Sequence, residues 1–246
     1  MKTITPQELA EMIRRSSLVA ALTGAGISVE SGIPDFRSPG GLWERFNPME
    51  YAHIRAFLTN PKKVWLLLKE MDATIMAARP NPAHLALASL EAQGKLAGII
   101  TQNVDNLHQA AGSKKVVEYH GNALSFVCLA CKQRYAREDL DFKKAPLYCP
   151  CGGLMKPDVV FFGEGIPAAV QEAADDLARN CDLLLVIGTS AEVAPAAYIP
   201  YTAKSYGAVI VENNLEHTGL SRRLTDHFLP GPAGRVWPQV LKAMTS

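Results

Sequence analysis

The sequence predicts an α/β fold in which a parallel β-sheet carries helices on both faces and accommodates a smaller inserted module. Short, unbroken apolar runs recur along the chain, and segments with helical spacing separate several of them. Parallel strands are buried on both faces and therefore appear as continuous apolar runs. Strands and helices in alternation are typical of this fold class. Residues 38–79 and 123–157 interrupt the alternation, and we interpret both as inserts into the sheet domain.

The expected elements follow from these runs in chain order. Residues 6–17 place Leu9, Met12 and Ile13 on one face of a helix. The apolar runs predicted to form strands are residues 17–22, 96–101, 115–120, 158–162, 182–188 and 208–213. Helices are expected at 82–93 and 168–180 between them. In the first insert, helical segments are expected around residues 53–58 and 62–71.

Composition and charge argue against several classes of function. The chain has 246 residues, with 25 Lys and Arg against 24 Asp and Glu, so its formal net charge is +1. A nearly neutral protein is not expected to bind nucleic acid or a membrane surface through its overall charge. No apolar run reaches the roughly 18–20 residues that a membrane helix needs, and residues 1–17 lack the apolar core of a signal peptide. A cytoplasmic location is therefore expected.

A glycine-rich turn follows the first predicted strand directly, with the sequence Gly24-Ala25-Gly26-Ile27. A Gly-x-Gly turn at this place allows backbone N–H groups to approach a pyrophosphate. The usual dinucleotide fingerprint has a third glycine, where this chain has Val29, and an acid at the end of the second strand. Glu44 has the spacing of that acid but falls in a loop. The departures disfavour an ordinary dehydrogenase, and a tight turn without a ligand remains the alternative.

An acid, an aromatic ring and a cation come soon after this turn, as Asp35, Phe36 and Arg37. A carboxylate can orient an amide or a hydroxyl group, and an aromatic ring can exclude water from a reactive centre. An arginine can neutralise a phosphate or pair with the acid. The combination indicates a binding site rather than a plain loop.

Four of the five cysteines lie within 24 residues, as Cys128, Cys131, Cys149 and Cys151. They form a C-x2-C pair and a C-x-C pair separated by 17 residues, which resembles the spacing of zinc ribbons. In a cytosolic chain such a cluster favours a metal over disulfides. Four thiolates leave no open coordination position, so the predicted zinc is structural. Four incidental cysteines are the alternative, and Cys181 stands apart from the cluster.

With these motifs the chain resembles the sirtuins, a family of NAD-dependent protein lysine deacylases. The signature segment is GAGISVESGIPDFRSPGGLW, and the other family motifs follow in order. These are TQNVDNLH at 101–108, EYHG at 118–121, the four cysteines, VVFFGE at 159–164, GTSAEVAPA at 188–196 and Asn214. The resemblance covers roughly residues 15 to 240. It implies that NAD is consumed as a co-substrate and that one zinc ion is structural.

Polar residues follow two of the predicted strands. Gln102, Asn103 and Asp105 come after residues 96–101, and both ligand binding and capping of a following helix are open from the residues alone. The resemblance implies that Asn103 and Asp105 line the pocket for nicotinamide and its ribose, with Gln102 nearby. His120 ends the run 115–120, and a histidine titrates in the range that suits a general base near neutral pH. The resemblance makes His120 the catalytic base.

The remaining site residues come from the resemblance. The residues expected to contact NAD are Gly24, Ala25, Gly26, Ile27, Asp35, Phe36, Arg37, Gln102, Asn103, Asp105, Gly188, Thr189, Ser190, Asn214 and Ala233. The residues expected to contact an extended substrate peptide are Val160, Phe161, Gly163, Glu164 and Val193. The peptide is expected to add a strand by main-chain hydrogen bonds.

The resulting prediction is an NAD-dependent protein lysine deacetylase that releases nicotinamide and O-acetyl-ADP-ribose. The predicted domains are a discontinuous Rossmann-like domain at 1–37, 80–122 and 158–246, a helical insert at 38–79 and a zinc-ribbon insert at 123–157. The first alternative is a mono-ADP-ribosyltransferase, which would use the same NAD site. A hydride-transferring dehydrogenase and a non-catalytic zinc-ribbon protein that binds DNA or protein are weaker alternatives.

The resemblance also carries an expectation about the acyl group. Family members that prefer succinyl-lysine or malonyl-lysine carry a Tyr-x-x-Arg pair, and these positions fall on Leu68 and Met71 when counted from Val64 and Trp65. Neither side chain can pair with a carboxylate. Acidic-acyl specialists also tend to carry Thr where this chain has Asp35. We therefore expect a preference for neutral acyl groups: acetyl, propionyl or butyryl, with longer fatty chains also open.

Overall fold

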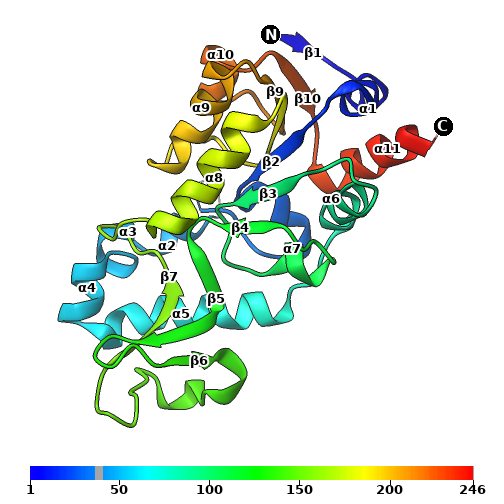
Figure 1. Cartoon of the computed structure of the whole chain (residues 1–246). Helices are drawn as coiled ribbons and strands as arrows, with labels where there is room; N and C mark the ends of the chain where they lie inside the picture. The colour runs from blue at the N-terminus through cyan, green and yellow to red at the C-terminus, as the bar shows by residue number, and fades with distance from the viewer. Residues whose placement is uncertain (37–40, 246) are drawn as a thin grey trace.

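The computed structural model describes residues 1–36 and 41–245, and these residues form a parallel sheet domain and a smaller module (Figure 1). Within the described residues the main sheet has seven strands in the order β1-β10-β9-β8-β2-β3-β4. Their bounds are Lys2–Thr3 for β1, Val19–Thr23 for β2, Gly98–Thr101 for β3, Val116–Glu118 for β4, Leu183–Ile187 for β8, Val209–Asn214 for β9 and His227–Pro230 for β10.

Neighbouring strands of this sheet are parallel, and β2 lies between β3 and β8. The chain proceeds from β2 to β3 and β4 on one side and later returns to β8, β9 and β10 on the other side. The order of these strands is that of the Rossmann fold, with β1 added at one edge. The strand order therefore reverses between β2 and β8, and ligands of such sheets bind outside the carboxyl ends of the strands at that point.

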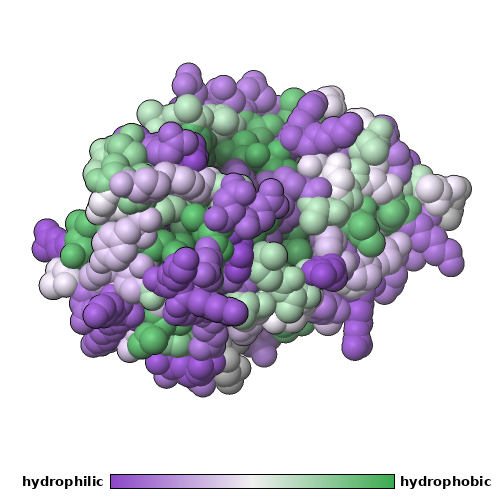
Figure 2. All heavy atoms as spheres, turned by 90° about the horizontal axis from the view of Figure 1, so that it is seen from below, coloured by the Kyte–Doolittle hydropathy of each residue, from purple (hydrophilic) through white to green (hydrophobic). Residues whose placement is uncertain are grey.

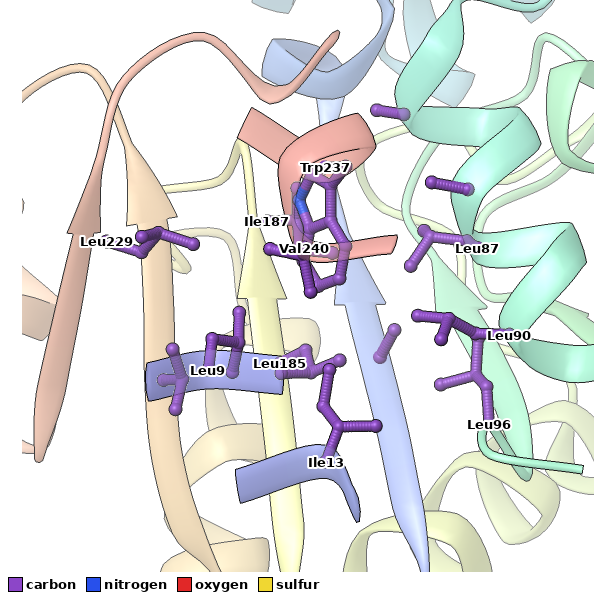
Figure 3. Packing of buried hydrophobic residues seen from close by; sticks show 14 of the residues in the cluster. Leu9, Ile13, Leu87, Leu90, Leu96, Leu185, Ile187, Leu229, Trp237 and Val240 are labelled. Carbon is purple, nitrogen blue, oxygen red and sulfur yellow. The ribbon is translucent and has the colours of Figure 1, made fainter. Parts of the chain in front are cut away.

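Helices cover both faces of the sheet. The helices α1 (Pro6–Arg15), α6 (Pro82–Ala92) and α11 (Ala233–Thr245) share a buried apolar cluster with Leu185 and Ile187 of β8 (Figure 3). On the other face, α8 (Ala168–Asn180), α9 (Ile199–Ser205) and α10 (Gly219–Arg223) share a cluster with Leu184 and Val186. Alternate residues of one strand thus serve opposite faces, which explains its unbroken apolar run.

The smaller module contains α2 (Leu42–Arg45), α3 (Pro48–Tyr51), α4 (Ile54–Thr59) and α5 (Pro61–Ala77), with an antiparallel sheet in the order β6-β5-β7. The bounds are Gly121–Cys128 for β5, Arg134–Ala136 for β6 and Met155–Val159 for β7. Short elements complete the chain: α7 (Leu107–Ala110) and the 3₁₀ helices η1 (Ala25–Ser31), η2 (Arg137–Asp139), η3 (Phe142–Lys144) and η4 (Ala196–Tyr198).

The helical and cysteine-bearing segments of this module share one apolar core. Trp65 of α5 stacks on Phe126 of β5, with ring centroids 6.2 Å apart and an interplanar angle of 13°. Arg137 forms a bidentate ion pair with Asp72 of α5, with both N–O distances at 2.6 Å. The two segments, far apart in sequence, therefore pack into one body. From below, hydrophobic patches lie among hydrophilic side chains on this end of the molecule (Figure 2).

Three features of the fold differ from the expectations. The run 158–162 was expected in the parallel sheet, but its first residues end β7 in the antiparallel sheet of the module. The strand expected at 115–120 ends at Glu118, which leaves His120 in the turn before β5. The edge strand β1, with two residues, and its neighbour β10, with four, lie outside the predicted runs. No helix among residues 1–36 and 41–245 is long and apolar enough to cross a membrane.

Candidate active site

The glycine turn after β2 is locked against the loop after β8. The N–H of Gly24 donates to the carbonyl of Ile187 at 3.1 Å, and the N–H of Gly26 donates to the carbonyl of Gly188 at 2.8 Å. A Cβ atom on Gly26 would lie 2.7 Å from Gly188 Cα, and one on Gly24 would lie 2.6 Å from Thr189 Cβ. The glycines are therefore required by the close approach of two loops. The N–H groups of both glycines donate to this contact.

The loops after β3, β8 and β9 meet around one threonine. The side-chain amide of Gln102 donates to Thr189 Oγ1 at 3.0 Å. The side-chain amide of Asn214 lies 3.4 Å from the Thr189 carbonyl. Ser190 follows in the same loop and is half-buried. Residues that the sequence placed in separate motifs thus gather at the carboxyl ends of adjacent strands.

A buried polar cluster lies behind this edge. Ser28 Oγ donates to Asp105 Oδ2 at 2.7 Å, and the amide of Asn103 donates to Ser28 Oγ at 3.0 Å and to the Gly24 carbonyl at 3.1 Å. Burial raises the pKa of Asp105 above its ordinary value, and the hydrogen bonds from the Leu107 N–H and from Ser28 offset only part of this rise. Asp105 Oδ1 also accepts from the N–H of Leu107, the first residue of α7, whose N-cap residue is Asn106.

Ser28 is the member of this cluster that the sequence reasoning missed. It lies within the motif that identified the site and is 1% exposed in the structure. A hydroxyl group in the first turn after a Gly-x-Gly motif was the available signal. The role of the Ser28 hydroxyl becomes clear only in the folded chain, where Asn103 and Asp105, just after β3, lie within hydrogen-bond distance of it.

Two buried histidines, His84 and His108, lie next to this cluster. His84 Nε2 lies 3.5 Å from Ser28 Oγ, and His108 Nε2 lies 2.9 Å from Thr23 Oγ1. Burial lowers the pKa of His84 to about 4. Burial and the neighbouring His84 lower the pKa of His108 to about 3. Both rings are therefore neutral at physiological pH, and the only group of this cluster that can carry charge is Asp105.

His120 has the geometry of a general base. Its Nδ1 lies 3.1 Å from the carbonyl oxygen of Gln102, which can only accept a hydrogen bond, so Nδ1 carries the proton. Nε2 then keeps its lone pair and is the atom that can take a proton. Burial lowers the pKa of His120 below its ordinary value, and the hydrogen bond to the Gln102 carbonyl offsets only part of this effect. The neutral form of the ring therefore dominates at pH 7. The carbonyl of His120 accepts from the N–H of Val160 at 2.8 Å, which joins the base to the predicted substrate loop.

The loop from Val160 to Glu164 is tied on one side and open on the other. The N–H of Phe161 donates to Glu164 Oε2 at 2.9 Å, and Phe162 exchanges backbone hydrogen bonds with Ala52 and Ile54 at 3.0 Å each. In the described part of the chain, the carbonyl of Val160 and both backbone groups of Gly163 have no hydrogen-bond partner. Gly163 has a φ of 86°, a conformation that favours glycine.

The segment after the glycine turn carries a row of aromatic rings. The ring centroids of Phe36 and Trp43 are 5.0 Å apart, and those of Trp43 and Phe162 are 6.4 Å apart. The row therefore connects the glycine turn to the predicted substrate loop. The carbonyl of Asp35 accepts from the N–H of Leu42 at 3.0 Å. Arg37, which was also predicted to contact NAD, lies outside the described residues.

The two outermost predicted contacts lie at the ends of neighbouring elements. Ala233 is buried at the start of α11, where the next N–H, that of Gly234, donates to Glu30 Oε2 at 2.5 Å. Val193 lies in the loop before η4, and its carbonyl accepts from Ala197 at 2.9 Å. Each is on the same edge of the sheet as the glycine turn, because α11 follows β10 and this loop follows β8.

The four predicted zinc ligands come together in the module. Their Sγ atoms all lie within 4.8 Å of one another. The Cys128–Cys151 and Cys131–Cys149 pairs have Sγ–Sγ distances of 3.5 and 3.6 Å. A tetrahedral zinc site with Zn–S bonds of about 2.3 Å has its sulfur atoms about 3.8 Å apart, so the cluster fits zinc.

The surroundings of the Cys149 thiol also suit a metal. Tyr135 Oη lies 3.0 Å from Cys149 Sγ, and this hydrogen bond, with that from the Cys151 N–H, lowers the pKa of Cys149 to about 6. A Cβ atom on Gly153 would lie 2.6 Å from Cys128 Sγ, so glycine is required for the approach of the turn. Cys181 is outside the cluster, and burial raises the pKa of its thiol to about 11. A deprotonated thiol is the form that binds zinc.

Taken together, the strand order and the polar groups at its reversal define the class of the protein: a Rossmann-like nucleotide-binding enzyme with a structural metal site in an inserted module. Comparisons with known proteins give the family. The model of the Sir2 family matches residues 24–195, and the chain belongs to this family.

Relatives and solved structures agree over nearly the whole chain. "NAD-dependent protein deacylase 2" of Pyrobaculum aerophilum is 47% identical, over 95% of this chain and 94% of that protein. "NAD-dependent protein deacylase" of Pyrococcus furiosus is 45% identical, over 96% of each. A mutant Sir2 homologue in complex with ADP-ribose has a TM-score of 0.93 and 39% identity, over 97% of this chain and 96% of that one.

Other solved relatives hold further ligands. A Sir2 homolog–NAD complex has a TM-score of 0.92 and 38% identity, over 99% of this chain and 95% of that one. A Sir2 mutant with a deacetylated p53 peptide and 3'-O-acetyl-ADP-ribose has a TM-score of 0.92 and 34% identity, over 97% of this chain and 98% of that one.

Proposed function

We propose that the chain is an NAD-dependent protein lysine deacetylase that releases nicotinamide and O-acetyl-ADP-ribose from acetyl-lysine proteins. The observation that carries this proposal is the position of His120. His120 is bonded through Nδ1 to the Gln102 carbonyl, just after β3 at the carboxyl edge of the sheet, and through its own carbonyl to Val160, in a loop with free backbone groups. Family membership and the names of the relatives support the same activity.

NAD binds across the carboxyl ends of β2, β3, β8 and β9 in this proposal. The residues that contact it are those predicted from the sequence, with Ser28 added. Asn103 and Asp105 bind the nicotinamide end, because their polar atoms are buried and fixed by Ser28. Thr189, Ser190 and Asn214 bind the ribose and phosphates at the reversal point, and Ala233 contacts the adenine end. Buried polar groups held in fixed geometry bind a ligand without the cost of ordering them first.

The chemistry follows from this placement. The acyl oxygen of acetyl-lysine forms a bond to the ribose carbon of NAD while the bond from that carbon to nicotinamide breaks. The acetyl group then passes to a ribose oxygen, and one water completes the release of the free lysine amine and O-acetyl-ADP-ribose. His120 Nε2 takes the proton from a ribose hydroxyl and so makes that oxygen a nucleophile toward the acyl carbon. The Gln102 carbonyl holds the ring in the required tautomer. Phe36, packed on Trp43, excludes water from the reacting sugar carbon.

The peptide binds between two loops by main-chain hydrogen bonds. Gly163 offers both its N–H and its carbonyl, and Val160 offers its carbonyl. Val193 is the contact on the opposite loop. Such pairing depends little on the side chains of the partner strand, so we propose that many acyl-lysine sequences are accepted. Phe161 and Glu164 contribute by shaping the loop, since their groups are used within it.

The remaining features of the proposal concern the module, the partners and the location. The domain boundaries predicted from the sequence stay part of this proposal. One zinc ion is held by the four cysteines and has a structural role. Acyl-lysine proteins are the partners, and the net charge of +1 supports the proposal that nucleic acid is not among them. The thiol cluster supports a cytoplasmic location, where cysteines stay reduced.

Mass spectrometry of an acetyl-lysine peptide incubated with the protein and NAD tests this function. Deacetylation lowers the peptide mass by the acetyl group. A mono-ADP-ribosyltransferase, which would use the same NAD site, instead adds ADP-ribose to the peptide. We expect the first product only, and no formation of NADH absorbance. A gain of ADP-ribose without loss of acetyl would contradict the proposal.

A further inference from the structure

A buried lysine lies beneath the predicted substrate loop. Lys156 is in β7, where its backbone pairs with Val127 of β5, and the residue is 6% exposed. Lysine is almost never buried to this extent unless its ammonium group is paired. The sequence analysis assigned no role to this residue, and the proposed reaction does not use it.

The ammonium group of Lys156 connects both ends of the loop. Its Nζ donates to the carbonyl of Val159 at 2.6 Å and to Glu164 Oε2 at 2.8 Å. It also lies 4.8 Å from the centroid of the Phe161 ring, a cation–π contact. The lysine therefore contacts the residue before the loop, a residue within it and the residue at its end.

The carboxylate of Glu164 completes the connection. The oxygen that accepts from Lys156 also accepts from the N–H of Phe161 at 2.9 Å. With its side chain 27% exposed, Glu164 is partly shielded from water, and Lys156 is 7% exposed. Charge-assisted hydrogen bonds between shielded groups are stronger than neutral ones. The pair thus fixes the turn from Val159 to Glu164 from the inside.

The residues that the pair holds in place are those with free backbone groups. Val160 and Gly163 lie between the two anchored ends, and the Val160 carbonyl and both backbone groups of Gly163 have no hydrogen-bond partner among the described residues. A peptide strand gains its hydrogen bonds only if these groups are already in line, because ordering a loop on binding costs affinity. The pair supplies that order before the peptide arrives.

We propose that Lys156 is a positioning residue for the acyl-lysine peptide: through Glu164 it holds the 160–164 loop in the conformation that receives the substrate main chain, without touching the substrate. The inference rests on the proposed function, because it concerns the peptide site of that reaction. It assigns to Lys156 an effect on peptide binding and none on NAD, whose predicted contacts lie on other strands.

Steady-state kinetics of Lys156→Met with an acetyl-lysine peptide tests the inference. Lys156→Met removes both hydrogen bonds of Nζ, and one charge-assisted hydrogen bond alone is worth about 1.5–3 kcal/mol, so we expect KM for the peptide to rise by roughly 10-fold or more. KM for NAD and the zinc content are expected to stay at wild-type values. Lys144→Met is the matched control, because Lys144 in the same module pairs with Asp141 at 3.7 Å while 81% exposed. It should leave both KM values unchanged.

Two further variants separate positioning from general stability. Lys156→Arg keeps a cation and should restore KM for the peptide to within about threefold of wild type. Glu164→Gln combined with Lys156→Met should be little worse than either alone, because both remove the same connection. If Lys156→Met does not fold, Glu164→Gln and Lys156→Arg decide the point. A wild-type KM for the peptide in Glu164→Gln, or a raised KM for the peptide in Lys156→Arg, would then overturn the inference.

The same measurements distinguish a failure of the positioning role from a failure of the proposed deacetylase function. Wild-type protein that turns over no acyl-lysine peptide would contradict both. Wild-type turnover together with an unchanged peptide KM in Lys156→Met would contradict the positioning role alone. Equal rises in KM for peptide and for NAD would also contradict it, since they would indicate a general loss of structure.

Discussion

At the carboxyl edge of the parallel sheet, the functional groups are fixed by hydrogen bonds between strand ends. In the inserted module, four thiols and an aromatic cluster hold together segments that are distant in the chain. Asn103 and Asp105 are 9% and 7% exposed and keep their places through Ser28 and the glycine turn. Cys131 and Cys151 are exposed and lie in turns.

The difference shows what each region depends on. The sheet edge is built on β2, β3 and β8, whose ladders and two-sided core consist of protein groups alone. The module's core includes Cys128 and Cys149 themselves, next to Trp65 and Phe126. We therefore expect zinc to contribute to the stability of the module, and NAD to bind at groups that the strands of the sheet hold in place.

Removal of zinc should have the largest effect, and it should fall on the module. Cys128→Ser is expected to lose the metal and all deacetylation, because zinc binding contributes about 10–16 kcal/mol to folding in small zinc modules. Elemental analysis should find one zinc per wild-type chain and none in the variant. Cys181→Ser is the matched control, since Cys181 is a buried cysteine of the sheet domain that lies outside the cluster. A stable, fully active zinc-free protein would show the contrast to be wrong.

Loss of the base should affect chemistry and spare NAD binding. His120→Ala is expected to lower deacetylation about 10²–10⁴-fold, the usual contribution of a general base. NAD affinity, measured by calorimetry, should stay within a few-fold, because the glycine turn and the Ser28 cluster are unchanged. His217→Ala, at an exposed histidine that packs on Phe228, is the control and should retain activity. Turnover close to wild type in His120→Ala would remove the base from this account.

If Leu68 and Met71 contact the acyl group, as the family resemblance implies, the enzyme should reject acidic acyl groups. Leu68 packs against the module core and Met71 is half-buried, and neither can pair with a carboxylate. Burying an unpaired carboxylate costs several kcal/mol, so kcat/KM for a succinyl-lysine peptide should be roughly a thousandfold below that for the acetyl peptide. The double variant Leu68→Tyr, Met71→Arg should narrow this gap. Equal or faster succinyl turnover by the wild type would contradict the assignment of these positions.

The buried histidines of the sheet edge should make the fold sensitive to acid. The pKa of His84 is about 4 when folded, against 6.5 for a free side chain. A base with a lowered pKa stabilises the fold above its unfolded pKa, and the stability is lost as the pH falls through the folded value. Between pH 6.5 and 4 the loss is roughly 3 kcal/mol for His84 alone.

Chemical denaturation across this pH range measures that loss. His84→Gln, which cannot titrate, should have a shallower pH dependence than wild type. Asp105, whose pKa is raised by burial, acts in the opposite direction, and comparing the two proteins cancels its contribution because both retain it. Identical slopes in the two proteins would show that His84 is not buried in its neutral form.

The sequence predicted the sheet well where strands are long and buried. The runs around β2, β3, β8 and β9 were found because both faces of each strand are apolar. The runs could not show which sheet a strand joins, so residues 158–162 were assigned to the wrong one. Pairing partners depend on contacts between distant segments, which a single run of residues does not contain.

The candidate site was predicted in part for the same reason. The zinc ligands were found because their spacing carries the chemistry, and the structure brings all four together. Ser28 and Lys156 were missed because each acts through another residue: Ser28 through Asp105 and Lys156 through Glu164. A serine in a turn and a lysine in a strand have no unusual spacing, and only the folded chain shows that both are buried.

The most direct test of the account is the product balance of a single reaction. Wild-type protein is incubated with NAD and one acetyl-lysine peptide, and nicotinamide, free-lysine peptide and O-acetyl-ADP-ribose are quantified together by mass spectrometry. The account predicts equal amounts of the three, and no nicotinamide release when the peptide is unacetylated. Free acetate without nicotinamide release, or ADP-ribose attached to the peptide in place of O-acetyl-ADP-ribose, would contradict it.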